Sequence, residues 1–251
     1  MIISPDEQLP DNSLVKSTST LTLNARSPPP VHPAMQYQGT SALPPGYTEL
    51  GKPTTNITYT CSPQTIPANS MIVTPPAYVN SLQKPYFISV NMNCFTPTSY
   101  ITTIRRGSWD GELVGDFEMG LTTSRKPATI CLRGNEQPLS EGLESNYRIF
   151  HNMHQSWTWK VSEYDKTTTI FWEETPGPGL PLTCFSSKEK VVGNILARFL
   201  PPRHPRKQGR PSDSTRLEVT PYGHEFIDDI VMSALIIERI RTAPSAWALP
   251  F

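Results

Sequence analysis

Five basic side chains lie close together in one stretch of the sequence, and their chemistry suits the binding of phosphate groups. The stretch "PPRHPRKQGRP" covers residues 201–211. Its basic residues are Arg203, His204, Arg206, Lys207 and Arg210. An arginine guanidinium can face two phosphate oxygens at once, while a lysine ammonium adds a point charge. The cluster is therefore a candidate patch for an anionic membrane surface, although a solvated loop between two strands is the commoner outcome for such a stretch.

Two copies of a Pro-Pro-x-Tyr motif occur in the first third of the chain. The first copy comprises Pro44, Pro45 and Tyr47, and the second comprises Pro75, Pro76 and Tyr78. Pro-Pro-x-Tyr resembles the ligand of WW domains, including those of HECT-type ubiquitin ligases. A polyproline-II segment is already extended, so it loses little entropy when it docks on an aromatic groove. Two copies could bind tandem WW domains with avidity; the alternative is a chance occurrence in a proline-rich region.

The remaining residue types do not assemble into a catalytic or metal-binding pattern. The sequence lacks Gly-x-Ser-x-Gly, His-Glu-x-x-His and a glycine-rich phosphate loop. His151 and His154 could hold a metal on a helix, but "HNMHQS" is typical of a hairpin turn with exposed histidines. Asp228 and Asp229 would diverge by about 100° on a helix, so we assign them to the helix dipole. We therefore expect no catalytic residue, no metal site, no cofactor and no enzyme activity.

The four cysteines are well separated along the chain. They are Cys61, Cys94, Cys131 and Cys184. This spacing excludes a Cys-x-x-Cys zinc or redox motif and favours free thiols in a reducing compartment. We predict that the last three lie in the core as small apolar residues. Cys61 lies among prolines, so we predict that it is exposed.

Composition limits the partners and the location of the protein. Lys and Arg total 22, and Asp and Glu total 22, so the formal net charge is zero and no global field attracts nucleic acid. The first residues, "MIISPDEQLPDNS", contain acids where a signal peptide needs a basic region. No run reaches about 18 apolar residues, so we expect no transmembrane segment. These features predict a cytoplasmic protein, at most peripheral at membranes, with no nucleic-acid partner.

Proline content divides the chain into an arm and a packed domain. The chain has 27 prolines, and those before residue 83 interrupt helical and strand patterns. We therefore predict a disordered arm over 1–82, with polyproline-II character where prolines cluster. The pattern changes at "KPYFISVNMN" (84–93), where short β-branched and aromatic segments separated by turn residues begin. About ten strand candidates follow, which favours a mainly β domain over 83–242.

A single long helix is predicted over 224–241. Acidic residues begin it and arginines end it, as the helix dipole favours, and the apolar residues between them point in nearly every direction. A helix that is apolar all round must be buried, and at about 24 Å it is short for a bilayer. Only strands remain to surround it, so we predict a closed antiparallel β-barrel around this helix. Residues 243–251 are predicted to form an apolar tail that packs on the barrel exterior.

The order of these segments resembles a known fold. The segments that carry the resemblance are "SYITTIRRG" (99–107), "NYRIFH" (146–151), the aromatic pair of "WTWKV" (157–161), "NILARFLPP" (194–202), "RLEVTPYG" (216–223) and "HEFIDDIVMSALIIERIR" (224–241). Over about 84–242 the chain resembles a fungal family of unknown function with the tubby C-terminal-like fold, shared by tubby proteins, LURP-one-related proteins and phospholipid scramblases. The resemblance implies a barrel with its last helix threaded through the middle.

The activities of these relatives do not transfer to particular residues of this chain. The Lys/Arg arrangement with which tubby proteins bind phosphoinositides cannot be placed on the sequence, and no calcium segment like that of scramblases is present. The resemblance therefore implies a fold rather than an activity. We predict a non-catalytic binding protein, with the barrel as a scaffold or anionic-lipid-surface module and the arm as a recruiter of WW-domain proteins. The alternatives are a scramblase-like membrane-associated protein and an enzyme on the barrel.

Overall fold

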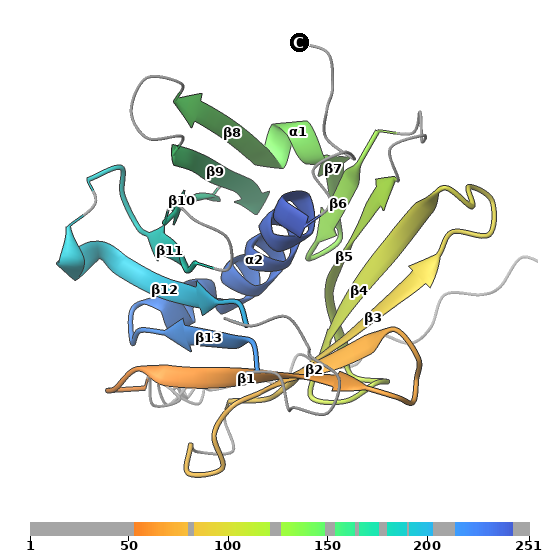
Figure 1. The fold of residues 1–251 in the computed structure, drawn as a ribbon, viewed down its shortest axis with the longest axis horizontal. Coiled ribbons are helices and arrows are strands. Elements are labelled where there is room, and N and C mark those ends of the chain that lie inside the picture. The colour runs from red at the N-terminus through yellow and green to blue at the C-terminus, as the bar shows by residue number, and fades with distance from the viewer. Residues whose placement is uncertain are drawn as a thin grey trace, which may run out of the picture. The chain divides into compact units, whose positions relative to one another are not determined.

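One antiparallel sheet of 13 strands curls around a single long helix in the computed structural model (Figure 1). The structure describes residues 53–79, 83–120, 127–148, 154–163, 166–175, 180–189, 191–202 and 214–242. These residues all belong to the unit Tyr47–Phe251. The predicted mainly β class is therefore confirmed for the described part of the chain.

The strands pair almost entirely with their neighbours in sequence. They are β1 Ile57–Gln64, β2 Ser70–Thr74, β3 Tyr86–Met92, β4 Ser99–Arg106, β5 Glu112–Gly120, β6 Thr129–Leu132, β7 Asn135–Pro138, β8 Leu143–Arg148, β9 His154–Glu163, β10 Lys166–Glu174, β11 Leu182–Phe185, β12 Ile195–Leu200 and β13 Arg216–Val219. Their order across the sheet is β7-β6-β5-β4-β3-β2-β1-β13-β12-β11-β10-β9-β8. Two meanders, β1 to β7 and β8 to β13, are thus joined by the antiparallel pair of β1 with β13.

The sheet is not closed, which corrects the predicted barrel. Its two edges are β7 and β8, which follow each other in the chain and are linked by the four-residue helix α1 (Leu139–Gly142). Figure 1 shows α1 lying between these two edges, and its residues Leu139 and Gly142 are buried. Strand β7 is short and ends in Pro138, which has no N–H to donate to a partner strand. The helix therefore occupies the place where a closing strand pair would have formed.

The packed domain begins earlier than the sequence pattern indicated. Residues 57–64 and 70–74, which we had assigned to the disordered arm, form β1 and β2 in the middle of the sheet. In β1 the side chains of Ile57, Tyr59 and Cys61 are buried and alternate with less buried neighbours, as expected for a strand with one face toward a core. The boundary at residue 82 is therefore wrong for this stretch. Residues 1–52 and the predicted tail 243–251 lie outside the described residues.

The helix α2 (Ile227–Thr242) confirms the prediction of a buried C-terminal helix. A short 3-10 turn over Gly223–Phe226 precedes it, so the α-helix begins three residues after the predicted start. The consecutive residues from Asp229 to Ala234 are all buried, so this part of α2 is enclosed on every side. Within the described residues, no helix has both the length and the hydropathy needed to cross a membrane.

Large aromatic side chains fill the space on one side of α2. Trp157 and Trp159 lie in β9 and Trp172 lies in β10, and each is at most 1% exposed. Trp157 pairs with Trp172 across the two strands. The indole N–H of Trp172 donates a hydrogen bond of 2.9 Å to Ser233 Oγ on the helix. This side of the core is therefore tightly occupied.

A candidate ligand cavity beside the C-terminal half of the helix

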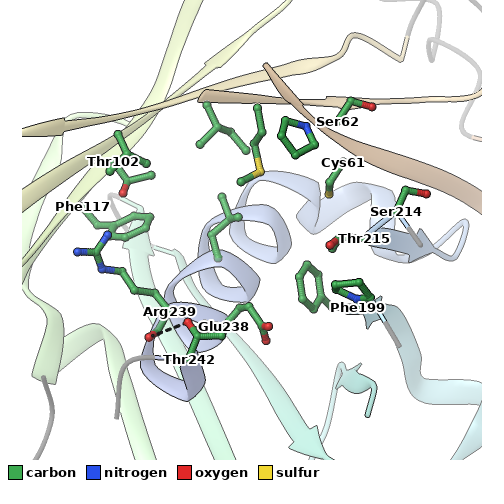
Figure 2. Close-up of a pocket in the computed structure, with 16 residues that line it drawn as sticks. Cys61, Ser62, Thr102, Phe117, Phe199, Ser214, Thr215, Glu238, Arg239 and Thr242 are labelled. Atoms are coloured by element: carbon green, nitrogen blue, oxygen red, sulfur yellow. Dashed lines mark hydrogen bonds between the residues drawn. The ribbon is translucent and has the colours of Figure 1, made fainter. Parts of the chain in front are cut away.

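A cavity of about 550 Å³ lies between the inner face of the sheet and the C-terminal half of α2 (Figure 2). Strands β1 to β5, β12 and the two residues before β13 contribute to its wall. Most of its surface is apolar, and the apolar side chains that form it include Met71, Ile88, Val90, Phe117, Phe199 and Leu235. The cavity has the size of typical small-molecule sites, about 300–1,000 Å³, and their mainly apolar lining.

The size of the side chains explains why space remains here. The wall contributed by β1, β3 and β4 includes Cys61, Val90 and Thr102, and its largest side chain is Ile88, whereas the strands β9 and β10 carry three tryptophans. Small side chains facing the end of a helix leave a void unless the backbone moves inward. The backbone of these strands is held in the sheet by antiparallel pairing on both sides. The void is therefore a consequence of the residues in this sector.

Three residues of the last turns of α2 add polar groups to the cavity. They are Glu238, Arg239 and Thr242. Figure 2 shows the side chains of Glu238 and Arg239 leaving the helix in different directions. The hydroxyl of Thr242 donates to the carbonyl oxygen of Glu238 at 2.8 Å, so it completes the helix end. The cavity thus combines an apolar interior with two charged side chains.

The carboxylate of Glu238 already has a partner. Arg241 Nη1 donates to Glu238 Oε2 at 3.0 Å, and Arg241 Nε donates to Glu174 Oε1 at 2.9 Å. Burial raises the pKa of Glu238, and the nearby Arg241 opposes this rise. The arginine therefore ties the end of α2 to β10 and neutralises much of the acid beside the cavity.

The guanidinium of Arg239 is in a different situation. Its Cζ atom lies 5.6 Å from the centroid of the Tyr100 ring, a cation–π contact. Among the described residues, no carboxylate lies within ion-pair distance of Arg239, and its side chain makes no hydrogen bond. Burial lowers the pKa of this side chain, yet an arginine keeps its charge at any physiological pH. The cavity therefore contains a half-buried cation that has no counter-ion among the described residues.

The other end of α2 is held by two ionic clusters, in which Asp229 is buried and the other charged side chains are partly exposed. Arg106 pairs with Asp228, which also accepts a hydrogen bond of 2.7 Å from Tyr86. Arg133 pairs with Asp229 at 2.8 Å, and Trp159 Nε1 donates to the same carboxylate at 3.0 Å. The two aspartates have different main partners, although Arg133 Nη2 also lies 4.0 Å from Asp228 Oδ2. Their predicted role in the helix dipole was therefore incomplete.

The basic cluster predicted from sequence is not part of the described structure. Arg203, His204, Arg206, Lys207 and Arg210 lie outside the described residues. The residues that flank this segment in the chain, Pro202 and Ser214, both line the cavity. The segment that carries the basic residues is therefore connected at both ends to the cavity wall.

The structure describes one of the two Pro-Pro-x-Tyr motifs. Pro44, Pro45 and Tyr47 lie outside the described residues. Pro75 and Pro76 follow β2 directly and are partly buried, whereas Tyr78 is 81% exposed. The N–H of Val79 donates to the carbonyl of Pro76 at 3.0 Å, which places the tyrosine in a turn. This motif therefore lies at the edge of the packed domain.

The histidines and cysteines differ in part from the predictions. His151 lies outside the described residues, and His154 begins β9. Cys61 is buried and lines the cavity, while Cys94 is exposed, so both predictions were wrong. Burial raises the pKa of Cys61 to about 12, so its thiol is protonated and is not a nucleophile at neutral pH. In the described part of the chain, no group of three or more His, Cys, Asp or Glu residues could hold a metal ion.

The fold and the cavity define a mainly β domain whose single antiparallel sheet curls around a C-terminal helix. A family model described as "Family of unknown function (DUF6593)" matches residues 68–243, and the chain belongs to this family. The match begins within the stretch that we had assigned to the arm and includes β2, in agreement with the structure. No curated protein and no solved structure gives a significant match to the chain.

Proposed function

We propose that this protein is a non-catalytic binding module whose cavity takes up a small molecule with an apolar body. The observation that carries this proposal is the 550 Å³ cavity with its mainly apolar lining beside α2. Binding there would stabilise the ligand by removing apolar surface from water. The sheet that surrounds α2 is attached to the beginning of the helix by the ionic clusters at Asp228 and Asp229.

Calorimetric titration tests this proposal directly. The full-length protein, stripped of bound lipid, is titrated with dodecanol and with dodecanoate below their micellar concentrations. Val90→Trp would fill the cavity and abolish binding of both compounds, and the milder Leu235→Phe would weaken it. Asn91→Trp serves as the matched control because Asn91 is the next residue in β3 and is exposed. Equal binding by Val90→Trp and Asn91→Trp, or no binding of either compound to the wild type, would rule out the cavity as a ligand site.

The basic segment supports a second proposal, that the domain contacts an anionic membrane surface. Its support is the sequence of residues 201–211 and the position of Pro202 and Ser214 on the cavity wall. Co-sedimentation with phosphatidylserine vesicles should be lost when Arg203, Arg206, Lys207 and Arg210 are changed to alanine. Phosphatidylcholine vesicles and the variant Arg216→Ala, which changes an exposed arginine of β13, are the controls. Undiminished sedimentation of the fourfold variant would remove the proposal.

The exposed side chain of Tyr78 supports a proposal for the Pro-Pro-x-Tyr motifs, namely that they recruit WW-domain proteins such as HECT-type ubiquitin ligases. Tandem WW domains should capture the wild-type protein in a pulldown, and they should not capture the variant in which both Tyr47 and Tyr78 are changed to alanine. Tyr222→Ala is the control because Tyr222 is 73% exposed and lies outside such a motif. Retention after the double substitution would end this proposal.

We also retain two proposals whose support is the sequence alone. One is the relationship of this domain to the fungal tubby-like family and, through it, to LURP-one-related proteins and scramblases. The other is a cytoplasmic location, peripheral at membranes. The first would be supported by a solved structure of another family member in which the last helix runs through the middle of a barrel. Microscopy of a tagged full-length chain would test the location.

A further inference from the structure

The cation in the cavity is the feature that the proposed function leaves without a role. Arg239 is half-buried at the edge of an apolar site, where its charge is less well solvated than in water. Tyr100 provides a cation–π contact at 5.6 Å, but an aromatic ring brings no negative charge. A partly desolvated guanidinium without a counter-ion is well suited to receive an anion, because it presents two parallel N–H donors to one carboxylate or phosphate.

The charges around Arg239 also favour this residue as the one that would bind an anion. Glu238 is the other charged group among the described residues that line the cavity, and its carboxylate is paired with Arg241 at 3.0 Å. The C-terminal end of a helix carries partial negative charge, which disfavours an anion in the last turn. An anionic group that enters the cavity would therefore depend on Arg239 rather than on the helix end. Its apolar remainder would contact side chains such as Val90 and Phe117, which line the same cavity.

We propose that the ligand of this cavity is a single-chain amphiphile with an anionic head group, and that Arg239 binds this head group. This inference rests on the proposed function and narrows it to one chemical class. The chain would lie in the apolar interior, and the carboxylate or phosphate would accept hydrogen bonds from the guanidinium. Arginine is the appropriate residue because its fork matches both oxygens of such a head group.

The test compares three ligands with the same chain and different heads. Dodecanoate, dodecyl phosphate and dodecanol are titrated into the full-length protein and into Arg239→Met, Arg239→Lys and Arg216→Met. The wild type should bind at least one of the two anions at least about tenfold more tightly than dodecanol. Arg239→Met should abolish this preference by lowering the affinity for the anions, while Arg239→Lys, which keeps the charge but not the fork, should retain part of it. The two anions distinguish a carboxylate head from a phosphate head.

The outcomes separate this inference from the proposal on which it rests. Binding of dodecanol by Arg239→Met reports that the variant is folded and that its cavity is intact. Arg216→Met removes an equal charge from the outer, exposed side of β13 and should keep the anion preference. If the wild type binds dodecanol and the anions equally, or if Arg239→Met keeps the preference, the inference is overturned while the cavity remains a ligand site. If none of the compounds binds, the proposed function is overturned as well.

Discussion

Polar side chains on α2 decide how this apolar helix is oriented inside the sheet. Asp229 and Ser233 are one turn apart, and both are fully enclosed. Asp229 accepts from Trp159, and Ser233 accepts from Trp172. A helix that is apolar in every direction could rotate about its axis at little cost, but a buried carboxylate or hydroxyl without its partner is expensive. These pairs therefore specify one rotation of α2, and with it the residues that face the cavity.

The pair of Asp229 with Arg133 gives a direct prediction for stability. Asp229→Ala should lower the free energy of unfolding by at least about 2 kcal/mol, because the indole N–H of Trp159 and the guanidinium of Arg133 both lose a buried acceptor. Urea unfolding followed by tryptophan fluorescence measures the change. Glu112→Ala is the comparison, since Glu112 pairs with Arg106 at 3.4 Å but is 68% exposed. Its effect should stay within about 0.5 kcal/mol, and equal losses for both variants would contradict this account.

The four cysteines should differ in reactivity in an order that burial determines. Cys94 is exposed, whereas Cys61 and Cys184 are buried and have raised pKa values. Because only the thiolate reacts, brief treatment of the native protein with iodoacetamide at mildly alkaline pH should modify Cys94 first. Peptide mapping by mass spectrometry measures the order, and the denatured protein, in which all four should react, is the control. Modification of Cys61 as fast as Cys94 would mean that the cavity wall is open.

Among the elements, the turn that leads from β13 into α2 depends on one glycine. A Cβ atom added at Gly223 would lie 2.1 Å from the carbonyl oxygen of Leu196, which is itself held by a hydrogen bond from Thr220 N at 2.9 Å. Gly223→Ala should therefore destabilise the domain by about 1–3 kcal/mol, the usual cost of overpacking. Gly193→Ala is the matched control, because a Cβ there meets nothing within 4 Å. Thermal unfolding of both variants measures the difference, and equal midpoints would refute the steric explanation.

The comparison of elements with the sequence shows what a local pattern can predict. The helix α2 was predictable because its apolar residues are contiguous and its ends carry the expected charges. Strand β1 was missed because Pro63 and the prolines that follow it outweighed the alternation of Ile57, Tyr59 and Cys61. That alternation indicates a strand, but the sequence does not show the strand with which these residues pair. The partner is β13, which lies far away in sequence.

The cavity could not have been predicted in the same way. Its wall brings Cys61 of β1 next to residues of α2 near the end of the chain. Arg239 looked like one of two arginines at a helix end, which is a common arrangement. Arg241 pairs with Glu238 and Glu174, and only this pairing distinguishes Arg241 from Arg239. The site is therefore a property of tertiary packing.

At the scale of the whole molecule, the position of β1 and β2 predicts the minimal folded domain. Deletion of residues 1–46, which removes the other unit of the chain, should leave a cooperative unfolding transition. Deletion of residues 1–82 removes two interior strands, so β3 and β13 each lose one of their two hydrogen-bonded neighbours, and the product should not unfold cooperatively. Circular dichroism with thermal unfolding measures both. A cooperative transition in the shorter product would show that β1 and β2 are dispensable.

The pairing of β1 with β13 also has a consequence for synthesis on the ribosome. Each meander can form from contacts between neighbouring segments as it emerges, but the seam between the meanders joins the first strand to the last. Such distant pairing is slow because the intervening chain must be ordered first. The apolar residues on the inner face of the first meander therefore stay exposed until α2 has been synthesised. We expect the nascent chain to engage chaperones throughout translation and to be released from them only after the last helix has docked.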